Sequence, residues 1–247
     1  MMGGWEIYYT GLVVMGASVV RGYTGFGFAM IMALALGFIF AQAMITPVVL
    51  ILDIAASLWL FIKVVQDVDW QSLKWIIFGA IPTLGLGSLA LTLVPARPMS
   101  IVISLLILGL CFILSKNKSP VTGQSRKTAL GAGLVSGFLS GMAALGGPPV
   151  VLYYFSSDRP VKQSRASMIT FFFLVDIMAL ASCAMNGLVT PQIVKLGLGM
   201  LIPSFIGIWA GNYLFEKFAN EKAFKAHVIR LLVITSLASL GKFTFFP

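Results

Sequence analysis

Apolar residues run almost without interruption through much of the chain, and polar residues gather in short stretches between these runs. A segment such as 101–114 leaves no polar face that a helix could present to water. A helix that crosses a bilayer needs about 20 predominantly apolar residues. The chain has 247 residues, so it has room for roughly eight to ten passes and for little outside them. The pattern predicts an all-α polytopic membrane protein.

Composition and charge support this fold class. Only 10% of the residues are charged and 59% are hydrophobic, whereas a soluble domain carries about 25% charged residues. Lysine and arginine outnumber aspartate and glutamate by 17 to 8, and they lie in short loops beside apolar segments. That placement is typical of membrane topology signals, so the lipid bilayer is the expected partner and nucleic acid is not. Cys111 and Cys183 lie within apolar runs, which indicates packing and predicts no metal site and no cofactor.

The two halves of the chain resemble each other. The glycine-rich segment 21–27 is similar to 136–142, and the tripeptide at 44–46 recurs at 168–170. Each half therefore has the order of a glycine-rich break followed by three further membrane helices, and repeats of this kind are usual in secondary transporters. The predicted organisation is a first repeat at 1–115, a cytoplasmic linker at 116–127 and a second repeat at 128–247.

The glycine-rich segments are too short to be ordinary membrane spans. Residues 5–20 and 26–40 form arms of about 15 residues, or roughly 23 Å of helix, against a hydrocarbon thickness of about 30 Å. In the second half, 128–145 and 148–155 flank the Gly-Gly-Pro-Pro sequence at 146–149. We interpret each pair as a helical hairpin with its tip inside the membrane. Re-entrant hairpins and pairs of short full spans both fit this pattern.

The distribution of basic residues tests the hairpin interpretation. If each hairpin returns to its own side, thirteen of the 17 basic residues lie on one face and three on the other, with Arg21 at a tip. If each glycine-rich region is one continuous crossing, the division is eight and eight. The positive-inside rule favours the hairpins. The halves are then inverted relative to each other, and both termini are predicted to be periplasmic in a bacterial inner membrane.

The hairpin tips are the predicted substrate site. A helix that begins inside the membrane directs unpaired N–H groups and a positive dipole end into the protein, which attracts anions. We expect Thr24 to cap the second arm of the first hairpin and Pro148 to begin that of the second. Tight helix packing is the alternative role for the glycines. The predicted substrate-binding residues are Arg21, Gly22, Tyr23, Thr24, Gly25, Gly27, Gly141, Gly146, Gly147, Pro148 and Tyr153.

Charged residues inside membrane segments are costly and usually functional. Arg21 suits the oxygens of a sulfonate, carboxylate or phosphate, and an internal ion pair with Asp53 or Asp176 is the alternative. Asp53 and Asp176 are predicted near the membrane midplane as proton carriers, and structural carboxylates are the alternative for both. Arg165 is interpreted as a topology charge near the basic face.

Residues 21–28 and the segment running from 136–141 to 146–154 resemble the TauE/SafE sulfite exporter family, also known as the 4-toluene sulfonate uptake permease family. The resemblance covers essentially the whole chain. It implies transport of sulfur-containing anions such as sulfite, thiosulfate or organosulfonates.

The expected function is therefore a secondary transporter for an organosulfonate or sulfite, proton-coupled and working by alternating access. An anion channel, or an exporter of another small oxyanion or carboxylate, stays open. An enzyme is not expected, because His227 is predicted far from either tip and no catalytic triad can form. A homodimer also stays open, since small-residue faces favour helix packing. These faces carry Gly79, Gly85, Gly87, Gly207 and Gly211.

Overall fold

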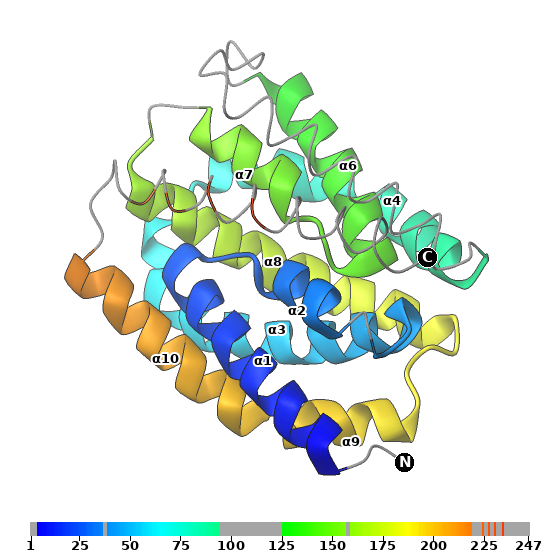
Figure 1. Ribbon diagram of the computed structural model, residues 1–247. Coiled ribbons are helices and arrows are strands. Elements are labelled where there is room, and N and C mark those ends of the chain that lie inside the picture. Colours follow the sequence, from blue (N-terminus) through cyan, green and yellow to red (C-terminus); the bar gives the residue numbers. More distant parts are fainter. Residues whose placement is uncertain are drawn as a thin grey trace.

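The computed structural model describes residues 4–36, 39–93, 125–156 and 159–218, together with the single positions 224, 227, 230 and 234 (Figure 1). Every element within these ranges is helical, which confirms the predicted fold class. The elements are α1 (Gly4–Thr24), α2 (Phe28–Leu36), α3 (Gln42–Val64), the 3-10 turn η1 (Val65–Asp67), α4 (Trp70–Leu93), α6 (Arg126–Ala143), α7 (Gly147–Phe155), α8 (Val161–Met185), α9 (Pro191–Gly199) and α10 (Leu201–Phe218).

Several of these helices are long and apolar enough to cross a membrane. Within the described ranges, α3, α4 and α8 meet this test individually, counting η1 with α3, and α9 and α10 meet it together as a pair bent by 44°. Most of the predicted linker and both chain ends lie outside the described residues. The predicted sidedness of the termini therefore stays a prediction.

Each glycine-rich hairpin consists of one long arm and one short arm. The long arms α1 and α6 have 21 and 18 residues, and the short arms α2 and α7 have nine each. At 1.5 Å per residue the short arms measure about 14 Å, less than half of the hydrocarbon thickness. The first arm is longer than expected, because α1 continues through Arg21 and Gly22 to Thr24.

The breaks between the arms have local causes. In the first hairpin, Gly25 and Gly27 have φ angles of 84° and 92°, which side chains with a Cβ rarely adopt. In the second, Ala144 ends α6 in the left-handed conformation, with φ at 57°. Its N–H donates to Ser140 O at 2.8 Å and the next amide donates to Leu139 O at 3.1 Å, which closes the helix end.

The long arm of each hairpin packs against a helix from the other half of the chain. The long arm α1 lies along α10, and the long arm α6 lies along α4, while α3 and α8 pack against each other between these pairs (Figure 1). Each long arm thus contacts the last described helix of the opposite half. This arrangement is what two related repeats around an approximate twofold axis would give.

Glycines allow the close approach within each pair. A Cβ atom at Gly22 or Gly211 would lie closer than 3.0 Å to backbone of the partner helix in the α1–α10 pair, and the same holds for Gly87 and Gly141 in the α4–α6 pair. Gly79 and Gly207 make equivalent contacts, whereas a Cβ at Gly85 would meet nothing within 4 Å. Most of the small-residue faces are therefore used inside one chain and give no support for a homodimer.

Candidate substrate site

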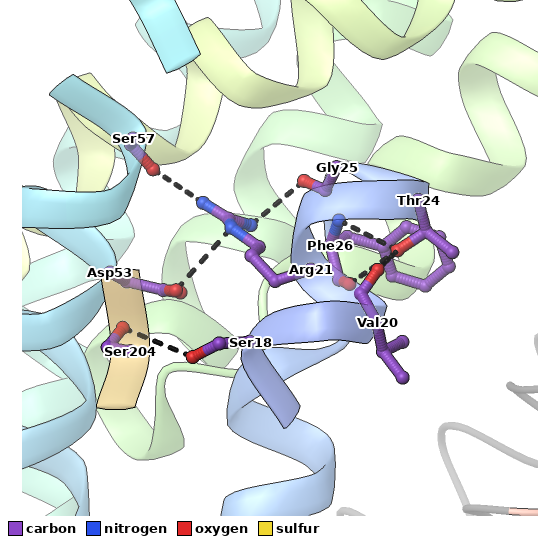
Figure 2. Close-up of polar contacts among 9 residues, drawn as sticks. All are labelled: Ser18, Val20, Arg21, Thr24, Gly25, Phe26, Asp53, Ser57 and Ser204. Carbon is purple, nitrogen blue, oxygen red and sulfur yellow. Dashed lines mark hydrogen bonds and ion pairs between the residues drawn. The ribbon is translucent and has the colours of Figure 1, made fainter. Parts of the chain in front are cut away.

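Arg21 lies in the last turn of α1 and is only 1% exposed. Its Nη1 donates to Gly25 O at 2.9 Å, and its Nη2 donates to Ser57 Oγ at 2.5 Å (Figure 2). Its Nε lies 3.5 Å from Asp53 Oδ1. The ion pair that the sequence offered as an alternative role for Arg21 is thus present in the structure.

The pair sits at the middle of a membrane span. Asp53 is eleven residues from each end of α3 (53 − 42 and 64 − 53) and is 4% exposed. A buried charge at this depth is expensive unless it has a partner, so the contact with Arg21 explains how both side chains are tolerated. The tip of the first hairpin therefore lies at the level of the midpoint of α3.

Asp176 joins this group from α8. It is 1% exposed and lies close enough to Asp53 and Arg21 to be affected by the charge of each. Its Oδ2 is buried and has no hydrogen-bond partner among the described residues. The centre of the protein thus gathers two carboxyl groups and one guanidinium, contributed by both halves.

The two hairpin tips meet beside Arg21. The guanidinium carbon of Arg21 lies 4.7 Å from the centroid of the Phe172 ring in α8. A Cβ atom built on Gly147 would lie 3.5 Å from Phe172 Cζ and 3.6 Å from Phe26 Cδ2. Phe172 is therefore shared by Arg21 and Gly147, and Phe26 of the first tip faces Gly147 of the second.

The tips offer different numbers of backbone donors. The first turn of α2 leaves amide N–H groups without intrahelical acceptors, as at any helix start. In α7, Pro148 lies in the first turn as predicted. Pro148 and Pro149 carry no N–H, so the donors at this tip come from Gly146 and Gly147. Thr24 does not cap α2: it is the last residue of α1, and its hydroxyl accepts from Phe26 N at 3.2 Å.

Three predicted site glycines have the packing role that the sequence offered as an alternative. Gly22 faces the backbone of α10, and Gly141 faces the backbone of α4. A Cβ at Gly146 would collide with Ser136 and Ser140, and Ser136 Oγ donates to Gly146 O. These glycines allow close packing of the hairpins, because the space where a side chain would lie is filled by neighbouring protein atoms.

Two predicted tyrosines point elsewhere. The Tyr23 hydroxyl lies 3.3 Å from His227 Nδ1, and its ring packs against Phe215 and Phe224. Tyr153 lines a cavity at the opposite end of α7 from Gly147. Neither has a contact with Arg21 among the described residues.

The sequence profile of the family described as "Sulfite exporter TauE/SafE" matches residues 10–239 of the chain. The chain belongs to this family. No curated protein sequence and no solved structure matches the chain. The family assignment makes the protein a membrane transporter of the TauE/SafE type.

The structure also places Ser140, a hydroxyl in the second hairpin, and His227, the single histidine of the sequence. Ser140 Oγ is buried without a hydrogen-bond partner among the described residues, and His227 contacts Tyr23 instead. His227 is thus nearer to the first hairpin than expected. Within the described ranges, no group of three or more His, Cys, Asp or Glu side chains gathers to hold a metal.

Arg165 is a second buried arginine of this TauE/SafE protein, and the sequence interpretation as a surface topology charge was wrong. It is 3% exposed, and its Nη2 donates to Gly22 O and, at 2.9 Å, to Asn212 Oδ1. Its Cζ lies 4.0 Å from the Phe215 ring centroid. Arg165 therefore binds the carbonyl end of α1 to α10.

A periodic signal could have revealed Arg165. Residues 165, 169, 172 and 176 follow the spacing of one helix face, which places Arg165 on the same side of α8 as Phe172 and Asp176. A cation on the face that carries an intramembrane carboxylate is more consistent with burial than with exposure at a membrane surface.

Two cavities flank the central group of charges. One of about 1070 Å³ is lined by residues of α1, α3 and α9, including Glu6 and Lys195. The other, of about 250 Å³, is lined by residues of α4, α6 and α7, including Lys74 and Arg159. Arg21, Asp53 and Asp176 line neither of these two cavities, and all three are buried.

Proposed function

We propose that this TauE/SafE protein is a proton-coupled secondary transporter that binds a sulfite or organosulfonate group between its two hairpin tips. The observation that carries the proposal is Arg21, a nearly fully buried arginine at mid-membrane depth beside both tips. An arginine at this depth needs an anionic partner, which Asp53 supplies in this structure, and its planar group also matches the oxygens of a sulfur oxyanion.

Arg21 has donors left for a ligand. The guanidinium has five N–H groups, of which two donate to Gly25 and Ser57. Its Nε lies 3.5 Å from Asp53 Oδ1 but makes no hydrogen bond within the described residues. A bound anion can use the remaining donors or replace Asp53. The N–H groups of Gly147 and of the first turn of α2 would complete the coordination, and Phe26 and Phe172 offer apolar surface for an organic substituent.

The charges support coupling to protons. Arg21 pairs with Asp53, and Asp176 lies in the same buried region. Arg165 adds a second buried cation beside Gly22 and Gly25. When an anion enters, the region would hold up to three negative charges against two positive charges. Protonation of at least one aspartate removes most of that cost. The anion and a proton would therefore bind together, with Asp53 and Asp176 as the proton sites.

The closed centre supports alternating access. The central group is buried between two cavities that lie at different ends of the helices. A carrier must close its site on both sides at some stage, whereas an open channel must not. This arrangement favours a carrier over the channel that the sequence left open.

The inverted topology in a bacterial inner membrane belongs to the same proposal. Gln66 and Gln192 are both exposed. Gln66 lies in η1, three residues after Lys63, and Gln192 lies in the first turn of α9. In a background lacking Cys111 and Cys183, a cysteine at position 192 should react with an impermeant thiol reagent in whole cells, and one at position 66 should not. The reverse labelling would contradict periplasmic termini.

Binding of sulfite and methanesulfonate to the purified protein tests the site. Titration calorimetry should show that Arg21→Ala weakens binding by about 1.5–3 kcal/mol, the range for hydrogen bonds to charged groups. Gly147→Val should block binding, while Gly147→Ala should have a smaller effect, since its Cβ would meet Phe172 and Phe26 at ordinary contact distances. Wild-type affinity in folded Arg21→Ala and Gly147→Val proteins would show that the substrate binds elsewhere.

A further inference from the structure

We propose a second oxyanion site, separate from the hairpin tips, in the cavity where α4, α6 and α7 meet. We call it the basic pocket. It has a volume of about 250 Å³, and the residues that matter for its chemistry are Ser72, Lys74, Trp75, Arg126, Tyr153 and Arg159. Its volume lies below the roughly 300–1,000 Å³ of pockets for drug-sized ligands, so it suits a sulfite, sulfate, phosphate or sulfonate group.

The basic pocket carries uncompensated positive charge. Arg159 Nη2 lies 2.6 Å from Asp69 Oδ2, so this cation is neutralised and held in place. Lys74 and Arg126 have no carboxylate within ion-pair distance among the described residues. Lys74 and Arg126 are exposed, so they give the pocket two net positive charges that water can reach, and an anion is the electrostatically complementary ligand.

The nearest carboxylate, Asp69, is already engaged and does not oppose an anion. Its Oδ1 accepts from the amides of Gln71 and Ser72 at 3.1 and 3.3 Å, and its Oδ2 accepts from Ser72 Oγ at 2.5 Å. These bonds cap the start of α4. Together with Arg159 they satisfy the charge of Asp69 locally.

Two helix starts add to the positive potential. Residues of the first turn of α4 and the capping region of α6 both line the pocket. The close contacts of Gly79 with Leu130 and of Gly87 with Phe138 run in the same order along both helices, so α4 and α6 are parallel. Their positive dipole ends therefore open on the same cavity.

An unsatisfied donor in the lining supports the same conclusion. Arg159 Nη1 is buried and has no hydrogen-bond partner among the described residues. Such a group is costly unless a ligand or water accepts from it. The guanidinium carbon of Arg126 lies 5.2 Å from the centroid of the Trp75 ring, which places a fluorophore beside the site.

The basic pocket lies one short helix away from the proposed transport site. Gly147 begins α7 at the tip, and Tyr153 lies six residues further on, or about 9 Å along the helix. The idea that the transported anion binds here before it reaches the tips rests on the proposed function. The idea that the pocket binds an oxyanion depends only on the residues of the pocket.

Intrinsic fluorescence of the full-length protein in lipid nanodiscs tests the inference. Titration with sulfite and with methanesulfonate should give a saturable change that Trp75→Phe removes. Lys74→Ala and Arg126→Ala should each weaken binding about three- to fivefold, the scale of partly solvated charge contacts, and the double variant about tenfold or more. Lys63→Ala is the matched control, because this cation stacks on Trp59 at 4.0 Å and does not line the pocket.

Two lipid compositions identify the source of the oxyanion. If the sulfite signal is equal with and without phosphatidylglycerol in the discs, the ligand is the soluble anion. If phosphatidylglycerol abolishes it, a lipid phosphate occupies the pocket. Wild-type affinity in the double variant, or a Trp75 signal that responds to neither anion nor lipid, overturns the proposal. Arg21→Ala should leave this signal intact, so a failure of the tip site is distinguishable from a failure here.

Discussion

The Arg21–Asp53 pair makes a quantitative prediction about stability. Replacing Arg21 with alanine leaves Asp53 buried without its cation, and breaking one partner of a buried pair costs about 3–5 kcal/mol. Both side chains are nearly fully buried and separated by 3.5 Å. For a chain of this size, 1 kcal/mol corresponds to about 2–4 °C. We therefore expect Arg21→Ala to lower the melting temperature by about 6–20 °C.

The second replacement isolates the charge effect. Asp53→Asn keeps the shape of the side chain, and Asp176 still offsets the charge of Arg21, so we expect a loss of only about 1–2 kcal/mol. When Arg21→Ala and Asp53→Asn are combined, no unpaired carboxylate remains at position 53. The double variant should therefore be more stable than Arg21→Ala alone, with a coupling free energy of about 2–3 kcal/mol, which exceeds the cost of Asp53→Asn itself.

The assay is size-exclusion chromatography with fluorescence detection after heating in detergent, which reports the folded fraction. The exposed pair of Lys162 with Asp67, at 2.9 Å and with the lysine 72% exposed, serves as the control. Lys162→Ala should change stability by under about 1 kcal/mol. If Arg21→Ala melts no lower than Lys162→Ala, or the double variant gains nothing, the buried pair does not stabilise the protein as argued here.

Three further predictions concern single positions. Gly87→Ala should destabilise the protein by about 3 kcal/mol through a backbone clash, whereas Gly85→Ala should be neutral or slightly stabilising, as measured by the same melts. Arg165→Ala should lower thermal stability by about 3 kcal/mol and Arg165→Lys by less, and wild-type melting of both would contradict its structural role. Asp176→Asn should abolish uptake driven by a pH gradient in proteoliposomes while anion binding persists; unchanged uptake would make Asp176 structural.

The sequence was informative where a physical rule acts on a whole segment. Apolar runs of membrane length predicted α3, α4 and α8, because the bilayer requires them. The glycine and proline clusters marked both hairpin breaks, because those residues cannot continue a regular helix at these positions. The high cost of burying a charge in a membrane singled out Arg21, Asp53 and Asp176, and it indicated that they could pair with one another.

The direction of each side chain was beyond the reach of these rules. Gly146 and Gly147 are adjacent in sequence, yet one packs against Ser136 and the other faces Phe172. Tyr23 and Tyr153 lie in the predicted motifs but point to other surfaces. Such differences depend on the rotation of each helix about its axis, which is set by contacts with distant segments and is not written in the local sequence.

The packing of the helices indicates which of them can move together during transport. Glycine contacts between α1 and α10, and between α4 and α6, bring backbones so close that one helix cannot slide along the other without collision. Between these pairs, α3 and α8 meet through side chains such as the stacked rings of Phe61 and Phe173, 5.3 Å apart. Side-chain contacts can rearrange at small cost, so on the proposed mechanism the two glycine-packed pairs move as rigid units and α3 shifts against α8.

Cross-linking separates these two interfaces. A disulfide between cysteines replacing Ser18 and Ser204, whose hydroxyl oxygens lie 3.1 Å apart across α1 and α10, should leave sulfite transport in proteoliposomes intact, because it joins helices that move together. A short bifunctional thiol reagent joining cysteines at positions 61 and 173 should stop transport, because it holds α3 against α8. Reduction of the disulfide, and omission of the reagent, provide the controls for each pair. Transport that survives the second cross-link but not the first would place the moving interface along α1 and α10, and the rigid-unit mechanism would have to be abandoned.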